Sequence, residues 1–339
     1  MTDRLDDIAL RMVTPGKGIL AADESTGSIT KRLESINMPS TEDNRRDYRE
    51  MLFTSKDAMS ACISGVILFD ETLRQKARDG TSLVDIIKAA GAVPGIKLDT
   101  GAKPMALAPG ETITEGLDGL TERVAAYAKL GAQFAKWRAV IDIGPSQPTH
   151  NAIHANAHAL ARYAAICQAG GIVPIVEPEV LMDGDHDIDT CAEVTEWVLN
   201  EQFQELRFAG VRLEGIILKP NMVISGKKCP AQASREEVAT KTVKVLKRCV
   251  PASVPGIAFL SGGQSGQDAT AHLHLMNAMG PLPWQLTFSY GRALQADALK
   301  AWGGKRENVA AGQRAFSHRA RMNALAVMGQ WEEAAEKAA

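Results

Sequence analysis

Short apolar runs with the length of buried β-strands recur along the chain and alternate with longer stretches of helical periodicity. Apolar runs of about four to eight residues are typical of strands that are buried on both faces, as in a parallel sheet. No Pro- or Ser-rich linker divides this alternation into halves, which favours one continuous α/β domain. The eight predicted strands are residues 18–22, 64–69, 95–99, 134–138, 172–177, 215–219, 256–260 and 286–290.

Stretches of helical periodicity connect the predicted strands. The clearest covers residues 236–250, and Ser234 with Glu237 three residues later forms a capping-box sequence at its start. Eight such strand and helix units predict a closed parallel (β/α)8 TIM barrel, with an open doubly wound sheet as the alternative. A barrel needs roughly 250 residues. We therefore expect residues 1–339 to form a single TIM-barrel domain with an N-terminal extension and a C-terminal helical region around residues 309–338.

Charge and hydropathy exclude several classes of protein. The net charge is -2 at pH 7, and the basic pairs Arg45-Arg46 and Lys227-Lys228 do not extend into a patch. This argues against nucleic acid as a partner and leaves small anionic metabolites. The first residues lack the apolar core of a signal peptide, and no later stretch reaches the roughly 18 apolar residues of a membrane span. We expect a soluble, cytoplasmic protein with no membrane partner.

Cysteine and histidine positions do not indicate a metal site at the strand ends. The five cysteines form no C-x-x-C pair and are odd in number, so we expect buried thiols rather than disulfides or a zinc site. His150, His154 and His158 recur every four residues along one face of a predicted helix, and His272 and His274 lie in another helical stretch. The first spacing suits a solvated or interface surface. We expect no catalytic metal and no cofactor.

Ionisable residues lie where the apolar runs end, and in a parallel barrel this edge is where catalysis takes place. The two-residue period of a strand places Lys136 and Arg138 on one face and Trp137 on the other, and Glu177 and Glu179 likewise share a face. An ordinary ion pair at a strand end explains any one of these charges equally well. Gathered on one edge, they predict a site for a charged substrate. The residues concerned are Asp23, Glu24, Lys97, Asp99, Lys136, Arg138, Glu177, Glu179 and Lys219.

Lys219 is the clearest candidate for a nucleophile. It follows the apolar run 216–218 directly, and Pro220 comes straight after it, so we expect its amine to lie in a poorly solvated wall of the barrel. A lysine attacks a carbonyl only in its neutral form, and a neighbouring positive charge favours that form. Lys136 on the fourth predicted strand is the natural source of such a charge. A lysine that merely ends a strand is the competing interpretation.

Two glycine-bearing turns follow the last two predicted strands. The first reads SGGQSG at 261–266 and the second SYGR at 289–292. Glycine lets backbone N–H groups approach an oxyanion, the helix that begins after the turn adds its positive end, and Arg292 offers a bidentate donor. Tight turns also need glycine, but the position after strands seven and eight favours a phosphate site. Neither turn matches a dinucleotide- or triphosphate-binding pattern.

Motifs distributed over nearly the whole chain match those of a known family in the same order. They are GKGILAADESTGSITKRL at 16–33, GIKLDTG at 95–101, FAKWRAV at 134–140, VEPEVL at 176–181, DGDHD at 183–187, ILKPNMV at 217–223, LSGGQS at 260–265 and LTFSYGRALQ at 286–295. With these motifs the chain resembles the class I fructose-bisphosphate aldolases. The resemblance implies a TIM-barrel lyase of glycolysis and gluconeogenesis, and a homotetramer. It also implies reversible C3–C4 cleavage of fructose 1,6-bisphosphate to dihydroxyacetone phosphate and glyceraldehyde 3-phosphate through a lysine Schiff base.

The resemblance also implies roles for individual residues. Lys219 would form the Schiff base, and Glu177 would transfer protons as the carbinolamine loses water. Lys136 would be the cation beside the nucleophile, and Asp23 would take the C4 hydroxyl proton. The residues similar to the family's C1-phosphate site are Ser261, Gly262, Gly263, Ser289, Gly291 and Arg292. Those similar to its contacts for the sugar chain and the C6 phosphate are Ser25, Ser28, Arg32, Lys97 and Arg138.

One departure from the family pattern concerns the proton donor to the enamine. Many members end in a tail whose final tyrosine assists this step, whereas the last tyrosine here is Tyr290. We expect Glu177, or water assisted by the bound phosphate, to donate the proton instead. Two other functions remain open from the sequence. One is a catalytically silent scaffold that binds phosphosugars, and the other is a different Schiff-base aldolase or a transaldolase that acts on a single phosphate.

Overall fold

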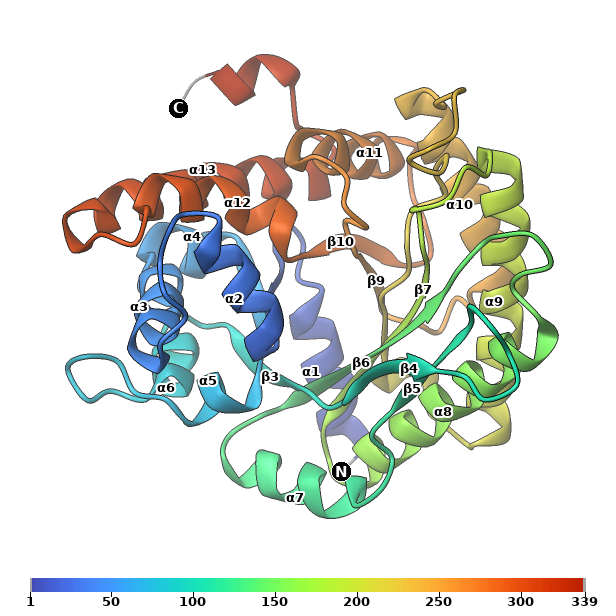
Figure 1. Ribbon diagram of the computed structural model, residues 1–339, viewed down its shortest axis with the longest axis horizontal. Helices are drawn as coiled ribbons and strands as arrows, with labels where there is room; N and C mark the ends of the chain where they lie inside the picture. Colours follow the sequence, from blue (N-terminus) through green and yellow to red (C-terminus); the bar gives the residue numbers. More distant parts are fainter. Residues whose placement is uncertain (1, 338–339) are drawn as a thin grey trace.

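Eight parallel strands close into a barrel within residues 2–337, the part of the chain that this computed structural model describes. The strands follow the order β1-β10-β9-β8-β7-β6-β3-β2 around the barrel (Figure 1). Because β1 pairs with both β2 and β10, the sheet is closed. The predicted TIM barrel is confirmed and the open sheet is excluded. The barrel strands are β1 (Gly18–Ala22), β2 (Ile63–Leu68), β3 (Val93–Lys97), β6 (Phe134–Ile141), β7 (Val173–Val180), β8 (Ile217–Leu218), β9 (Gly256–Phe259) and β10 (Gln285–Tyr290).

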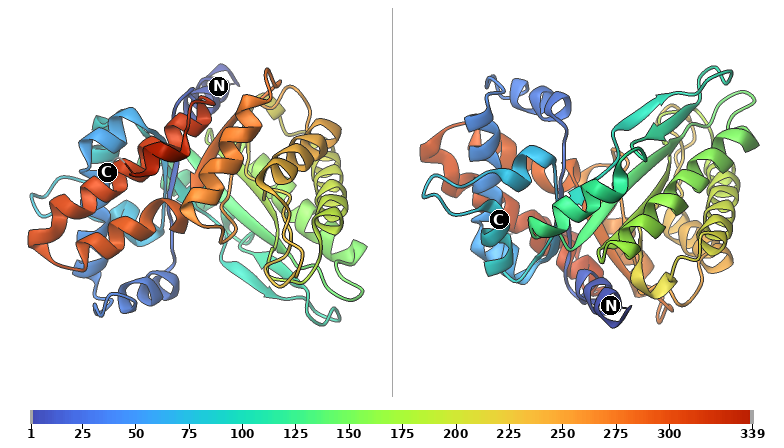
Figure 2. Two further views of the ribbon diagram at one scale, coloured as in Figure 1. Left: turned by 90° about the horizontal axis from the view of Figure 1, so that it is seen from above. Right: turned by 90° about the horizontal axis from the view of Figure 1, so that it is seen from below.

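Helices surround the barrel, and α8, α9, α10 and α11 follow one another around its outside (Figures 1 and 2). The predicted capping sequence before α10 is confirmed in part, since the hydroxyl of Ser234 accepts a hydrogen bond from the Glu237 N–H. The helices are α1 (Thr2–Met12), α2 (Thr26–Glu34), α3 (Glu42–Phe53), α4 (Lys56–Ala61), α5 (Asp70–Arg74), α6 (Leu83–Ala89), α7 (Leu120–Lys129), α8 (His150–Ala169), α9 (Ile188–Phe208), α10 (Arg235–Cys249), α11 (Gly266–Ala278), α12 (Arg292–Trp302) and α13 (Val309–Val327), with 3-10 turns η1 (Leu213–Gly215), η2 (Arg306–Asn308) and η3 (Glu333–Lys337).

Several predicted strand limits were wrong. The sixth predicted strand, 215–219, is reduced to the two residues of β8, because η1 occupies its start and Pro220 provides no N–H after its end. The third, predicted over 95–99, instead forms β3 two residues earlier. By contrast, β6 and β7 extend beyond their predicted ends and pair over eight positions. Apolar content marked each strand correctly, but hydrogen-bonded pairing with the neighbour decides where a strand ends.

A short hairpin outside the barrel was not predicted. It consists of the antiparallel strands β4 (Gly101–Pro104) and β5 (Thr112–Glu115), which follow β3 and precede α7 along the chain. Each strand has four residues, and most of their side chains are partly or fully exposed. Such segments carry no alternation of apolar and polar residues to distinguish them from a loop.

The N-terminal helix α1 closes the amino end of the barrel. Its apolar residues, among them Leu5, Ile8 and Met12, form one buried cluster with the first residues of the strands, such as Val93 and Phe134. Because α1 covers the amino ends of the strands, the barrel is accessible to a ligand from their carboxyl ends. The predicted N-terminal extension therefore serves as a plug.

A larger core fills the space between the strands and the surrounding helices. At its C-terminal side α13 packs against α11 and α12. This helix ends at Val327, so the predicted helical region 309–338 is broken before η3. All five cysteines are free and buried, as expected. Among residues 2–337, no helix is both long and apolar enough to span a bilayer.

Candidate active site

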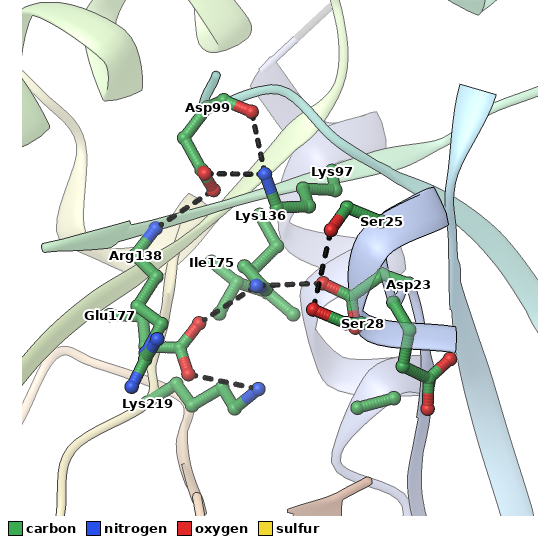
Figure 3. A network of polar contacts seen from close by, with 12 residues as sticks. Asp23, Ser25, Ser28, Lys97, Asp99, Lys136, Arg138, Ile175, Glu177 and Lys219 are labelled. Carbon is green, nitrogen blue, oxygen red and sulfur yellow. Dashed lines mark hydrogen bonds and ion pairs between the residues drawn. The ribbon is translucent and has the colours of Figure 1, made fainter. Parts of the chain in front are cut away.

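Four ionisable side chains form a continuous series of contacts at the carboxyl end of the barrel (Figure 3). Lys219 Nζ lies 3.1 Å from Glu177 Oε1, and Lys136 Nζ lies 3.3 Å from the other oxygen of the same carboxylate. Lys136 also contacts Oδ2 of Asp23 at 2.7 Å. All four residues are buried. The structure thus brings together the four residues that the sequence placed at strand ends.

The charges in this group stabilise one another against the cost of burial. Burial raises the pKa of Asp23, but the charges of Lys136 and Lys219 outweigh it and hold this pKa below its usual range. The same balance lowers the pKa of Glu177. Burial would lower the pKa of Lys136, yet Asp23 and Glu177 raise it above its ordinary value. At neutral pH the two carboxylates are therefore ionised and Lys136 is charged.

The orientation of Lys136 follows from its position in β6. Successive side chains of a strand point to opposite faces, so Trp137 points away from the barrel interior. Its ring packs on Tyr163 of α8, with the centroids 5.4 Å apart. The interior direction is left to Lys136 and Arg138, as the sequence predicted.

Backbone pairing brings Lys219 beside Glu177. Leu218, the last residue of β8, pairs with Val176 of β7. The N–H of Lys219 then donates to the carbonyl of Val176 at 2.8 Å. Because Glu177 is the next residue of β7, the lysine and the carboxylate start from neighbouring positions of two paired strands.

Two further predicted cations lie toward the rim of the barrel, each with an acidic partner. Lys97 Nζ lies 2.5 Å from Asp99 Oδ1. Arg138 Nε donates to Glu179, while the Arg138 backbone N–H donates to Asp99 Oδ2 at 3.3 Å. The Arg138 side chain is 43% exposed, so its guanidinium is accessible to a ligand in solution.

The helix after β1 supplies three more predicted residues. Ser25 is the N-cap residue of α2, and its hydroxyl lies 3.3 Å from that of Ser28 one turn later (Figure 3). Arg32 forms an ion pair with Glu24. It also lies beside Gly291, because a methyl group at that glycine would be 3.6 Å from Arg32 Nη2. Arg32 is therefore closer to the second glycine turn than its place in the sequence indicates.

The two predicted phosphate turns lie next to each other. Gly262 and Gly263 have positive φ values of 57° and 88°, which residues other than glycine adopt only with strain. A Cβ atom at Gly263 would be 3.2 Å from Nη2 of Arg292, so the second turn reaches the first. Ser261 is buried at the start of the first turn, and the buried Ser289 Oγ has no hydrogen-bond partner within residues 2–337. An unpartnered buried hydroxyl is a donor available to a ligand.

The sequence prediction missed one cation of this turn. Lys227 was interpreted as part of a short basic pair, yet its Nζ would lie 2.8 Å from a Cβ at Gly263. In the structure it pairs with Asp183 at 2.8 Å. Asp183 belongs to the DGDHD motif, which was the available signal, but nothing in the sequence linked that motif to the turn after β9.

Comparison with known proteins agrees with this geometry. The family model of class I fructose-bisphosphate aldolase matches residues 4–339. A probable fructose-bisphosphate aldolase class 1 of Xanthomonas campestris is 56% identical, over 97% of this chain and 99% of the relative. Fructose-bisphosphate aldolase C of Mus musculus is 55% identical, over 97% and 91%.

A solved structure shows the same fold. Fructose-bisphosphate aldolase from Plasmodium falciparum, crystallised in complex with TRAP and a small-molecule inhibitor, superposes with a TM-score of 0.95. It is 48% identical and the match covers 97% of this chain and 95% of that one. Because the family match extends across the barrel and includes every strand that carries a site residue, the chain belongs to the class I fructose-bisphosphate aldolases.

Proposed function

We propose that Lys219, Glu177, Lys136 and Asp23 perform the chemistry of this aldolase. The reaction is the reversible C3–C4 cleavage of fructose 1,6-bisphosphate to dihydroxyacetone phosphate and glyceraldehyde 3-phosphate, catalysed by a metal-independent lyase of glycolysis. The observation that carries the assignment is that Lys219 and Lys136 contact the two oxygens of one buried carboxylate, Glu177. A nucleophile and a proton carrier in contact are what Schiff-base formation needs.

Lys219 attacks the C2 carbonyl of the ketose. The amine must lose a proton to attack, and the carbinolamine must then gain one on its hydroxyl before water leaves. Glu177, 3.1 Å from Lys219 Nζ, is within hydrogen-bond reach for both transfers. The product of these steps is a protonated imine, which can accept the electrons of the C3–C4 bond.

Asp23 removes the C4 hydroxyl proton as the C3–C4 bond breaks. Its lowered pKa keeps it ionised, as a proton acceptor must be. The bond electrons pass into the iminium to give an enamine, and the aldehyde leaves. Lys136, 2.7 Å from Asp23, orients this carboxylate and stabilises its charge. Glu177, reprotonated from solvent, or water assisted by the phosphate, then protonates the enamine. Hydrolysis of the resulting iminium releases dihydroxyacetone phosphate and the lysine amine, and Asp23 returns its proton to solvent.

The glycine turns bind the C1 phosphate in this proposal. The positive φ values of Gly262 and Gly263 leave backbone N–H groups free to face an oxyanion, and Arg292 begins the 11-residue helix α12 at the same point. Guanidinium and helix end together favour a doubly charged group. The proposed ligands are Ser261, Gly262, Gly263, Ser289, Gly291 and Arg292.

The opposite end of the sugar contacts the rim cations. Lys97 and Arg138 are paired with Asp99 and Glu179, so a C6 phosphate must compete with these carboxylates for them. Ser25 and Ser28 add hydroxyl donors from α2. Arg32 completes the proposed set, and its position beside Gly291 also brings its charge close to the C1-phosphate turn.

Borohydride trapping tests the proposal. Reduction in the presence of fructose 1,6-bisphosphate should convert the imine to a stable amine, and peptide mass mapping should place the added mass on Lys219. Lys219→Met should abolish both trapping and cleavage. Trapping at another lysine, or full cleavage by Lys219→Met, would show the assignment to be wrong. Activity that survives a chelator in the same assay separates this mechanism from a metal-dependent one.

Three further features are proposals that rest on the family and the fold. We propose one domain over residues 1–339, supported by a buried core that extends from β1 to α13. Cytoplasmic location and assembly as a homotetramer are proposed from the family alone. Sedimentation at several concentrations would test the tetramer.

A further inference from the structure

A polar cluster outside the barrel joins α8 to α9. His154 and His158 are four residues apart on α8, and Glu201 and Glu205 are four apart on α9, so each pair lies on one face of its helix. Nδ1 of His154 lies 2.7 Å from Glu201 Oε1 and 3.8 Å from Glu205 Oε1. Nδ1 of His158 lies 2.9 Å from the other oxygen of Glu205.

The two carboxylates of this cluster are largely shielded from solvent and contact imidazole rings. The side chains of Glu201 and Glu205 are only 13% and 8% exposed. Within residues 2–337, imidazoles are their only ion-pair partners. Carboxylate oxygens and an imidazole nitrogen are also the ligands that a divalent transition metal binds, so one ion placed among them would neutralise both carboxylates.

We propose that His154, Glu201 and Glu205 bind one divalent transition-metal ion of the zinc class between α8 and α9. One ligand atom from each residue lies within 4.8 Å of the others. In a tetrahedral zinc site with bonds of about 2.0 to 2.2 Å, ligand atoms are about 3.3 Å apart. The side chain of His154 is 48% exposed and can rotate to make this adjustment.

His158 acts on the metal through Glu205. Its bond to the second oxygen of Glu205 fixes the orientation of that carboxylate, as outer partners of metal ligands commonly do. The fourth position on the ion is left to water. A nitrogen ligand with two carboxylates favours zinc and its neighbours over calcium or magnesium, which prefer oxygen alone.

The site would connect two helices that follow the catalytic strands. α8 comes after β6, which carries Lys136, and α9 comes after β7, which carries Glu177. An ion held by both helices stabilises the folded state, since the unfolded chain does not hold the three ligands together. The metal is separate from the Schiff-base chemistry, so its binding and the catalytic assignment are tested independently.

Zinc titration of tag-free, chelator-treated enzyme tests the proposal. Calorimetry should show one equivalent bound, and the melting temperature should rise with zinc concentration. Cobalt in place of zinc should give the visible absorption of a four-coordinate site. His154→Gln should weaken zinc binding on the order of 100-fold and remove the cobalt spectrum.

His150→Gln is the matched control. His150 lies on the same face of α8, and its ring stacks on that of His154 with the centroids 5.8 Å apart, yet it is not among the proposed ligands. Its replacement should leave zinc affinity unchanged. Equal binding by wild type and His154→Gln, or equal loss in His150→Gln, would overturn the proposal.

Glu201→Gln provides a second variant that keeps side-chain shape and removes the charge. It should weaken zinc binding as strongly as His154→Gln. Aldolase activity in the presence of chelator, equal to that of wild type for all three variants, verifies that each is folded. A folded Glu201→Gln that binds zinc like wild type would contradict the ligand set.

Discussion

The amine of Lys219 and the carboxylate of Glu177 form a 3.1 Å ion pair in which each side chain is only 4% exposed. Such a pair is costly to bury unless its partners are well placed, and here Lys136 holds the second carboxylate oxygen. The arrangement leaves Glu177 in contact with both a nucleophile and a permanent cation. It also makes the carboxylate the residue whose loss should affect the greatest number of steps.

Glu177→Gln should lower kcat by about 10²- to 10⁴-fold, because the amide keeps the shape but cannot transfer protons. Steady-state kinetics with fructose 1,6-bisphosphate measures this effect. Glu214→Gln, at an exposed acid before β8, is the control and should retain wild-type kcat. A loss of less than tenfold in Glu177→Gln would mean that another group carries the protons.

Removing the charge of Lys136 should raise the pH at which the enzyme loses activity on the acid side. The pKa values of Asp23 and Glu177 are lowered below their ordinary 3.8 and 4.5, so both are ionised throughout the neutral range in the wild type. The Lys136→Met variant lacks the charge that counteracts the effect of burial on these carboxylates. Both pKa values should therefore rise. A pH profile of kcat should show the acid limb at least about one pH unit higher.

The same carboxylates set the sign of a stability change. Because their pKa values are lower in the folded state, they contribute stability that is fully present above the ordinary values of 3.8 and 4.5. This contribution is lost as the pH falls from there through the folded values. In denaturant unfolding of the wild type, these two groups should cause no decrease in the free energy of unfolding above about pH 5. A loss already at pH 6 that disappears in Asp23→Asn would contradict this expectation.

His272 should destabilise the fold between about pH 6 and pH 4. Burial lowers its pKa from 6.5 to about 4, and its Nδ1 lies 2.7 Å from Gln264 Oε1. In this interval the unfolded chain binds a proton that the folded chain does not, so stability falls as the pH falls. At pH 5 the loss is about 2 kcal/mol.

His272→Gln should remove that part of the pH dependence. Urea unfolding at pH 7 and pH 5 measures the difference in unfolding free energy between the two conditions. This difference should be smaller in the variant by about 2 kcal/mol. An unchanged difference in His272→Gln would show that the buried imidazole does not resist protonation.

Gly263→Ala should weaken binding of phosphorylated substrate in addition to lowering the stability of the fold. Its φ of 88° costs an alanine about 1 to 2 kcal/mol, and the added methyl group would contact Lys227 and Arg292. Gly280→Ala is a matched control, because its φ is 98° and no atom lies within 4 Å of the added methyl group. Both variants should lose similar stability, but only Gly263→Ala should raise KM. Equal KM values would argue against phosphate at this turn.

The barrel could be predicted from local pattern. Apolar runs of strand length occur eight times in the sequence. The run at 216–218, followed by Lys219 and Pro220, predicted a buried amine at a strand end. The alternation in β6 likewise predicted that Trp137 and Lys136 lie on opposite faces of the strand, and the packing of Trp137 on Tyr163 agrees with this. These inferences succeeded because the period of a strand is a property of consecutive residues.

Other features depended on contacts between distant segments. The plug formed by α1, the hairpin of β4 and β5, and the approach of Lys227 to Gly263 have no local signature. Each depends on packing between segments that are distant in the sequence. The two-residue length of β8 is of the same kind, since it is set by pairing with β7 and β9.

Residue order alone thus specifies which charges stand at strand ends, because burial of an apolar run and the geometry of the following residue are local. It does not specify their partners. Glu177 meets both Lys136 and Lys219 only because β6, β7 and β8 are neighbours in the closed barrel, with a register that aligns their carboxyl ends. Partner choice among buried charges is a property of packing, since it depends on distances of a few ångströms between residues far apart in the chain.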